Sequence, residues 1–134
     1  MIEILYIKQR IQFKRKEYAD AYELADTMIS IQEKIIAIPL IQQNPTQLRA
    51  EKSELANMLH VKGQVSERCG IPFEEILKIA EKAIEIEEEQ CEGIVPSDLL
   101  GRLYKVKGGI CAYLGRSKDA QKWLTKAVEV FQVT

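Results

Sequence analysis

His60 is the only histidine in this chain of 134 residues, and histidine is the side chain that most readily transfers protons or binds a metal near neutral pH. No cysteine or pair of carboxylates stands beside it at the spacing of a ligand set. Cys69, Cys91 and Cys111 lie far apart and form no C-x-x-C pair, the usual start of a structural zinc site. We therefore expect no metal site and interpret His60 as a polar surface residue rather than a catalytic base.

Two other stretches have the composition of a ligand site but not its spacing. The glycine-containing stretch 108–117 lacks the G-x-x-x-x-G-K-[ST] pattern of a phosphate loop and lies in a helical pattern. A run of acidic residues has none of the interleaved Gly and Asp of a calcium loop and is typical of a solvated helix face. Its members are Glu85, Glu87, Glu88, Glu89 and Glu92. No nucleophile, base and orienting group converge, so the sequence predicts neither an enzyme nor a cofactor.

Apolar residues recur at helical spacing along the whole chain, and no stretch alternates as a strand would. The pattern predicts six helices, at about residues 2–16, 18–37, 46–69, 73–92, 97–114 and 117–133. One break is obvious, at residues 39–45, because prolines at both of its ends fit poorly inside a helix. The sequence thus predicts an all-α protein.

Two of these segments repeat each other. Gly63 and Gly70 recur at the same spacing as Gly108 and Gly115. Glycine within a helix costs about 1 kcal/mol relative to alanine, so Gly63 and Gly108 indicate close helix packing. Gly70 and Gly115 indicate the ends of helices. The second helices also correspond, through Ile76, Ala80 and Ala83 in one copy and Ala120, Leu124 and Ala127 in the other.

This pattern resembles the tetratricopeptide repeat, and a fainter copy precedes the two. The fainter copy has Leu5, Ala21 and Ala25 in the expected places, but Gln9 and Lys16 replace the glycines. The period is longer than the family's usual one of about 34 residues. The resemblance implies one domain over residues 1–134, a right-handed superhelical stack of about three helix–turn–helix repeats. These repeats would span about residues 2–38, 46–92 and 97–133.

In this family the first helix of each repeat lines the concave face of the stack. The resemblance therefore implies a partner-binding groove made of Tyr6, Arg10, Phe13 and Lys14, then Asn57, His60, Gln64 and Arg68, then Arg102, Lys105 and Tyr113. Glu3 and Glu67 would lie at its edge, so the groove would be mainly basic and the second helices acidic. Such a groove suits an acidic or carboxylate-ended peptide. The alternative is that these Lys and Arg residues are ordinary surface charges without a common partner. Gly109 departs from the family's clamp for chaperone tails, and we expect no such partner.

Two further surfaces are apolar. The first surrounds the proline-bounded break and consists of Ile35, Ile36, Ile38, Leu40 and Ile41. These side chains either pack between two long helices or form an exposed surface for a partner. The last helix carries Trp123, Val130 and Phe131, although a solenoid usually ends in a polar capping unit. Either a longer array continues beyond this helix or another subunit covers its apolar face. We expect self-association through this helix, with a homodimer as the expected form.

Charge and cysteine use favour one class of function. The chain has 19 basic and 20 acidic residues, so nothing draws it as a whole to nucleic acid or to a membrane. The start has no cleavable signal pattern, and three separated cysteines favour a reducing, cytoplasmic setting. We expect a non-enzymatic scaffold module that binds a protein or peptide. The alternative is a ligand- or peptide-sensing domain of a larger signalling or transcription regulator.

Overall fold

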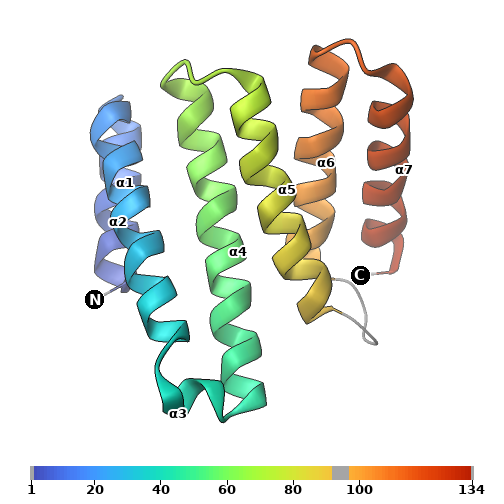
Figure 1. Cartoon of the computed structure of the whole chain (residues 1–134). Helices are drawn as coiled ribbons and strands as arrows, with labels where there is room; N and C mark the ends of the chain where they lie inside the picture. Colours follow the sequence, from blue (N-terminus) through green and yellow to red (C-terminus); the bar gives the residue numbers. More distant parts are fainter. Residues whose placement is uncertain (1, 92–96, 134) are drawn as a thin grey trace.

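The computed structural model describes residues 2–91 and 97–133, and in these residues the chain is all α-helical (Figure 1). The helices are α1 (Ile2–Lys14), α2 (Tyr18–Ile36), α3 (Pro39–Gln42), α4 (Pro45–Arg68), α5 (Phe73–Gln90), α6 (Asp98–Tyr113) and α7 (Ser117–Val133). The six longer helices stand side by side, and each packs mainly against its neighbours in the chain. The prediction of an all-α chain and of six long helices is confirmed.

The proline-bounded segment differs from the prediction, because it contains the short helix α3 at the end where α2 and α4 meet (Figure 1). Pro39 is the first residue of α3 and Pro45 the first of α4. Proline is well placed there, since the first residue of a helix has no partner for its N–H group. The apolar residues around α3 are divided: Ile41 is buried, whereas Ile38 and Leu40 are exposed.

Local capping explains where two of the helices begin. The Asn44 side chain accepts a hydrogen bond from the Gln47 amide at the start of α4. The Ser97 hydroxyl accepts one from the Leu100 amide at the start of α6. Each bond satisfies a donor that the first turn of a helix leaves without an intrahelical partner.

Helices α1, α4 and α6 end in the same kind of turn. After α4, the Gly70 amide bonds to the Glu67 carbonyl and the Ile71 amide bonds to the Ser66 carbonyl, with φ of +77° at Gly70. Gly115 closes α6 in the same way, with φ of +80°. These are Schellman turns, whose left-handed residue is usually glycine. The predicted helix-ending role of Gly70 and Gly115 is confirmed.

Lys16 closes α1 with the same pair of bonds, although it is not a glycine. Its φ is +61°, and it is the only residue other than glycine with positive φ in the described chain. The backbone of Lys16 therefore takes a left-handed conformation that costs an L-residue about 1–2 kcal/mol.

Replacing Lys16 with glycine should raise the free energy of unfolding by about 0.5–1 kcal/mol, because the relief of strain exceeds the added entropy of the unfolded chain. Thermal denaturation should show a melting temperature a few degrees higher. The matched control is Lys8→Gly, an exposed position inside α1, which should lower stability by about 1 kcal/mol. Equal effects of the two substitutions would contradict the turn assignment.

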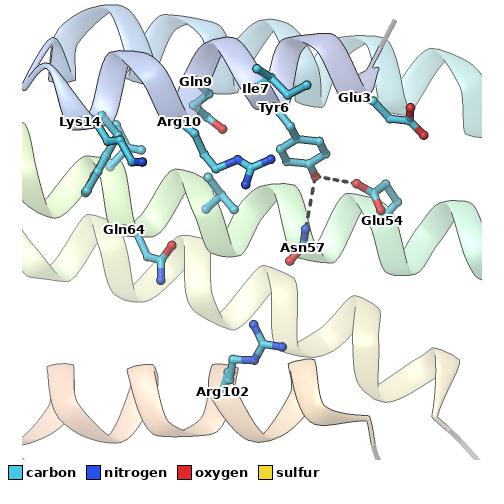
Figure 2. Close-up of a pocket in the computed structure, with 13 residues that line it drawn as sticks. Glu3, Tyr6, Ile7, Gln9, Arg10, Lys14, Glu54, Asn57, Gln64 and Arg102 are labelled. Atoms are coloured by element: carbon cyan, nitrogen blue, oxygen red, sulfur yellow. Dashed lines mark hydrogen bonds between the residues drawn. The ribbon is translucent and has the colours of Figure 1, made fainter.

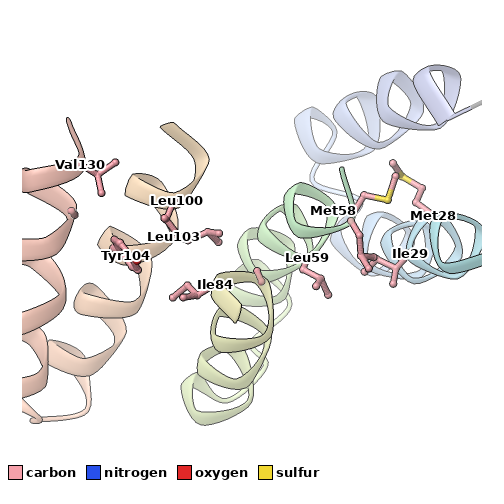
Figure 3. Close-up of a cluster of buried hydrophobic side chains, with 12 residues drawn as sticks. Met28, Ile29, Met58, Leu59, Ile84, Leu100, Leu103, Tyr104 and Val130 are labelled. Atoms are coloured by element: carbon pink, nitrogen blue, oxygen red, sulfur yellow. The ribbon is translucent and has the colours of Figure 1, made fainter. Parts of the chain in front are cut away.

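The core runs through the whole row of helices (Figure 3). Met28 of α2 and Met58 of α4 lie at one end of this cluster, Ile84 of α5 lies in the middle, and Leu103 of α6 and Val130 of α7 lie at the other. A second cluster of α5, α6 and α7 residues includes Cys111. Because both clusters are assembled from adjacent helices, each helix is held by the ones beside it.

The predicted close approach exists at Gly108 but not at Gly63. A Cβ atom added at Gly108 would lie 2.7 Å from Cγ of Leu124 in α7, closer than real side chains approach. A Cβ atom at Gly63 would meet only Ile76, at 3.9 Å, which is ordinary contact. The prediction was wrong at Gly63 because the helices around it leave room for a side chain.

Candidate functional site

A pocket of about 860 Å³ opens between α1, α4 and α6 (Figure 2). We call it the α1–α4 groove. Its walls are Glu3, Tyr6, Ile7, Gln9, Arg10, Phe13 and Lys14 of α1, Glu54, Asn57, Val61, Gln64 and Val65 of α4, and Arg102 of α6. Its apolar and aromatic wall residues are Tyr6, Ile7, Phe13, Val61 and Val65, and its charged ones are Glu3, Arg10, Lys14, Glu54 and Arg102.

A hydrogen-bonded group fixes the middle of the groove. The Tyr6 hydroxyl donates to Glu54 Oε1 over 2.5 Å and accepts from Asn57 Nδ2 over 3.3 Å (Figure 2). Burial raises the pKa of Tyr6, and the hydrogen bond and negative charge of Glu54 raise it further. Tyr6 therefore keeps its proton and stays a donor, which ties α1 to α4 at this point.

The structure brings seven of the eleven predicted groove residues together. They are Tyr6, Arg10, Phe13, Lys14, Asn57, Gln64 and Arg102. Arg68 stands just beyond them, with its guanidinium carbon 5.9 Å from the centre of the Phe13 ring. Three basic groups of the groove are solvent-exposed, and in Figure 2 Arg10 and Arg102 point into the space between α1 and α6. An anionic group that enters this space would meet charges from both helices.

Besides Arg68, three predicted groove residues do not line the pocket. His60 is buried, because α4 turns this position toward the core, and is only 8% exposed. Burial lowers its pKa, and the positive charge of Arg102 lowers it further. Lys105 is exposed away from the pocket, and Tyr113 lies against Phe73, with ring centres 4.2 Å apart. The interpretation of His60 as a polar surface residue was therefore wrong.

A second pocket, of about 830 Å³, adjoins the first. It lies between α1, α2 and α4 and is lined by Glu3, Tyr6, Ile31, Gln32, Ile35, Ala50, Glu51 and Glu54. Gln32 is buried and donates to both the backbone and the side chain of Glu51. The sequence did not point to this pocket, nor to Glu54, although Glu54 lies one helical turn before Asn57 on the same face.

The acidic run at the end of α5 contains one exception to the predicted solvated face. Glu87 is 3% exposed, and its two carboxyl oxygens accept hydrogen bonds from the hydroxyls of Ser53 in α4 and Ser97 at the start of α6. Glu85, Glu88 and Glu89 are exposed as predicted, and Glu88 accepts from the Tyr104 hydroxyl. Glu92 lies outside the described residues. Glu87 therefore joins three helices instead of facing solvent.

The predicted self-association surface on α7 also needs correction. Val130 is buried in the core, and Trp123 is half-buried between Tyr104 and the ammonium group of Lys107, which lies 3.9 Å from its ring centre. Phe131 is the one predicted residue that is exposed. The exposed apolar residues of α7 are Leu124, Val128 and Phe131, at helical spacing.

Self-association through α7 stays a prediction, now directed at this stripe. Val128→Glu should shift the protein toward monomer, because it places a charge in the middle of the stripe without removing a core contact. Sedimentation at several concentrations measures this shift. A wild-type protein that remains monomeric at high concentration would contradict the prediction.

Within the residues that the structure describes, no three His, Cys, Asp or Glu side chains lie together as a metal would require. The described helices also include none long and apolar enough to cross a membrane. No protein-family model matches this chain, and no curated protein matches it either.

Proposed function

We propose that this protein is a non-enzymatic interaction module that binds a segment of another protein in the α1–α4 groove. The observation that carries this proposal is the convergence of Arg10, Lys14 and Arg102 from two helices on one pocket that also has apolar and aromatic walls. Charged donors beside apolar and aromatic walls suit a peptide, since they combine charge-assisted hydrogen bonds with burial of apolar side chains.

We further propose that three helix pairs form a short right-handed superhelical stack of tetratricopeptide-like repeats. The pairs are α1 with α2, α4 with α5, and α6 with α7. Support comes from packing in chain order and from the identical turns at Lys16, Gly70 and Gly115. In such a stack the first helices share one face, and this face holds the groove.

The basic groups set the chemistry of the partner. Arg10 has an exposed side chain, and Arg102 bonds to the exposed carboxylate of Asp98 one turn earlier. An exposed pair of this kind contributes little to stability, so a ligand carboxylate competes with it at small cost. The Phe13 ring beside Arg68 adds a surface on which an apolar or aromatic side chain of the partner can pack.

A screen of random peptides against the whole protein tests the proposal. We expect the best binders to contain Asp or Glu beside apolar residues. Reversal of Arg10 and Arg102 to Glu should weaken their binding by about tenfold or more, because two attractions become repulsions. Fluorescence anisotropy of a labelled peptide measures the change, and circular dichroism should show unchanged helix content.

The matched control reverses two exposed basic residues outside the groove, Lys34 in α2 and Lys118 in α7. It changes net charge by the same amount and should leave peptide affinity within about twofold. Best binders that lack acidic residues, or equal losses in the two double variants, would refute the proposal.

A further inference from the structure

The two pockets adjoin along α1, and we call them together the trough. Both are lined by Glu3, Tyr6 and Glu54, so the hydrogen bond between Tyr6 and Glu54 stands where they meet. A segment lying along α1 would cross this bond and enter both pockets.

Charge is divided along this trough. Beyond the shared residues, the first pocket has three cations and no carboxylate: Arg10, Lys14 and Arg102. Beyond the same shared residues, the second pocket has one carboxylate, Glu51, and no cation. The two shared carboxylates, Glu3 and Glu54, line both pockets. Figure 2 shows Lys14 at one end of α1 and Glu3 and Glu54 toward the other, with Arg10 between.

The helix dipole explains only part of this division. Glu3 lies in the first turn of α1 and Lys14 in its last turn, where each stabilises its own helix. Arg10, Glu51 and Glu54 lie inside their helices, where the dipole favours neither sign. The helix dipole thus accounts for Glu3 and Lys14 but not for Arg10, whereas Glu51 and Glu54 also accept hydrogen bonds from Gln32 and Tyr6.

The two ends act as separate poles. The 13 residues of α1 span about 20 Å at 1.5 Å per residue. Charges in solution are screened beyond about 8 Å at physiological ionic strength. A ligand charge at one end of the trough therefore interacts mainly with the charged side chains at that end. A ligand charge of one sign cannot be attracted at both ends.

From this arrangement, which rests on the proposed function, we infer the class of partner. We propose that the trough selects a charge-segregated segment of another protein, acidic at one end, apolar in the middle and basic at the other. The acidic end lies beside Arg10, Lys14 and Arg102, and the basic end lies beside Glu3 and Glu51. The direction of the bound segment is then set by its own charge order.

Three synthetic peptides of about twelve residues with blocked ends, about the length of α1 when helical, test this inference. One has glutamates at one end and lysines at the other around an apolar centre; one has the same residues with the charges interleaved; one carries glutamates at both ends. The segregated peptide should bind the whole protein about 3- to 10-fold more tightly than either of the others. This advantage should vanish near 1 M salt, where the screening length is about 3 Å.

Glu3→Lys should remove the preference for the segregated peptide and favour the peptide with glutamates at both ends. Glu3 suits this test because it is exposed. Glu23→Lys, the same change at an exposed site of α2 outside both pockets, should leave the preference intact. A spin label on the lysine end of the segregated peptide should broaden amide signals near Glu3 and spare those near Lys14.

The outcomes separate this inference from the proposed function. If the peptide with glutamates at both ends binds wild-type protein best, the inference is wrong and the proposed function stands. If the interleaved peptide equals the segregated one, the inference is also wrong. If none of the three binds, both are overturned.

Discussion

Replacing Glu87 with alanine should lower the free energy of unfolding by about 2–4 kcal/mol. Ser53 Oγ lies 2.8 Å from one carboxyl oxygen and Ser97 Oγ lies 2.6 Å from the other. Both hydroxyls, which are partly buried, would lose an acceptor. Ser97 also caps α6, so the loss of its partner loosens the start of that helix.

Urea denaturation measures this loss, and two variants sharpen it. Glu85→Ala removes an exposed glutamate from the same helix and should change stability by less than about 0.5 kcal/mol. Glu87→Gln keeps an oxygen that accepts one of the two bonds and should fall between the other two. Equal midpoints for Glu85→Ala and Glu87→Ala would show that Glu87 is not the link described here.

The helices could be predicted because their signals are local. A proline at the first position, Ser97 at a cap and glycine in a left-handed turn each act within a few residues. The repeated glycines also supplied a frame, and the α1 residues that this frame assigned to one surface do line one pocket, although α1 itself lacks both glycines. Lys16 takes the left-handed conformation because the turn is over-determined by its two backbone bonds.

Burial of polar side chains was harder to predict, since it depends on partners far along the chain. Glu87 bonds to Ser53, and His60 lies near Arg102. A signal for Glu87 did exist: it follows Ala83 by four residues and Ile84 by three, and therefore continues the buried face of α5. We nevertheless predicted Glu87 to be solvated, because it lies in a run of neighbouring glutamates.

Glu51, at the acidic end of the trough, had no signal in the repeat pattern. The frame starts from the glycines near the ends of the first helices, and α4 has 24 residues where α1 has 13. Glu51 lies in the extra length of α4, which has no counterpart in α1. A comparison of repeats cannot assign a role to residues that only one repeat contains.

The same substitution at the two repeated glycines should have opposite effects. Gly63→Ala should raise the free energy of unfolding by about 0.5–1 kcal/mol, because alanine favours the helix and its Cβ has room. Gly108→Ala should lower it by about 1–3 kcal/mol, because the new Cβ would lie 2.7 Å from Cγ of Leu124 and 3.2 Å from its backbone nitrogen. Thermal or urea denaturation of the two variants measures both.

The difference between the two variants isolates packing, since the gain in helix propensity is common to both. Truncating the obstacle tests this further: in a Gly108→Ala/Leu124→Ala double variant, the second change should cost less than it does in wild-type protein. The backbone nitrogen of Leu124 stays close, so we expect partial rather than full relief. If Gly108→Ala stabilises the protein as much as Gly63→Ala does, then α6 and α7 do not approach closely at Gly108 and Leu124.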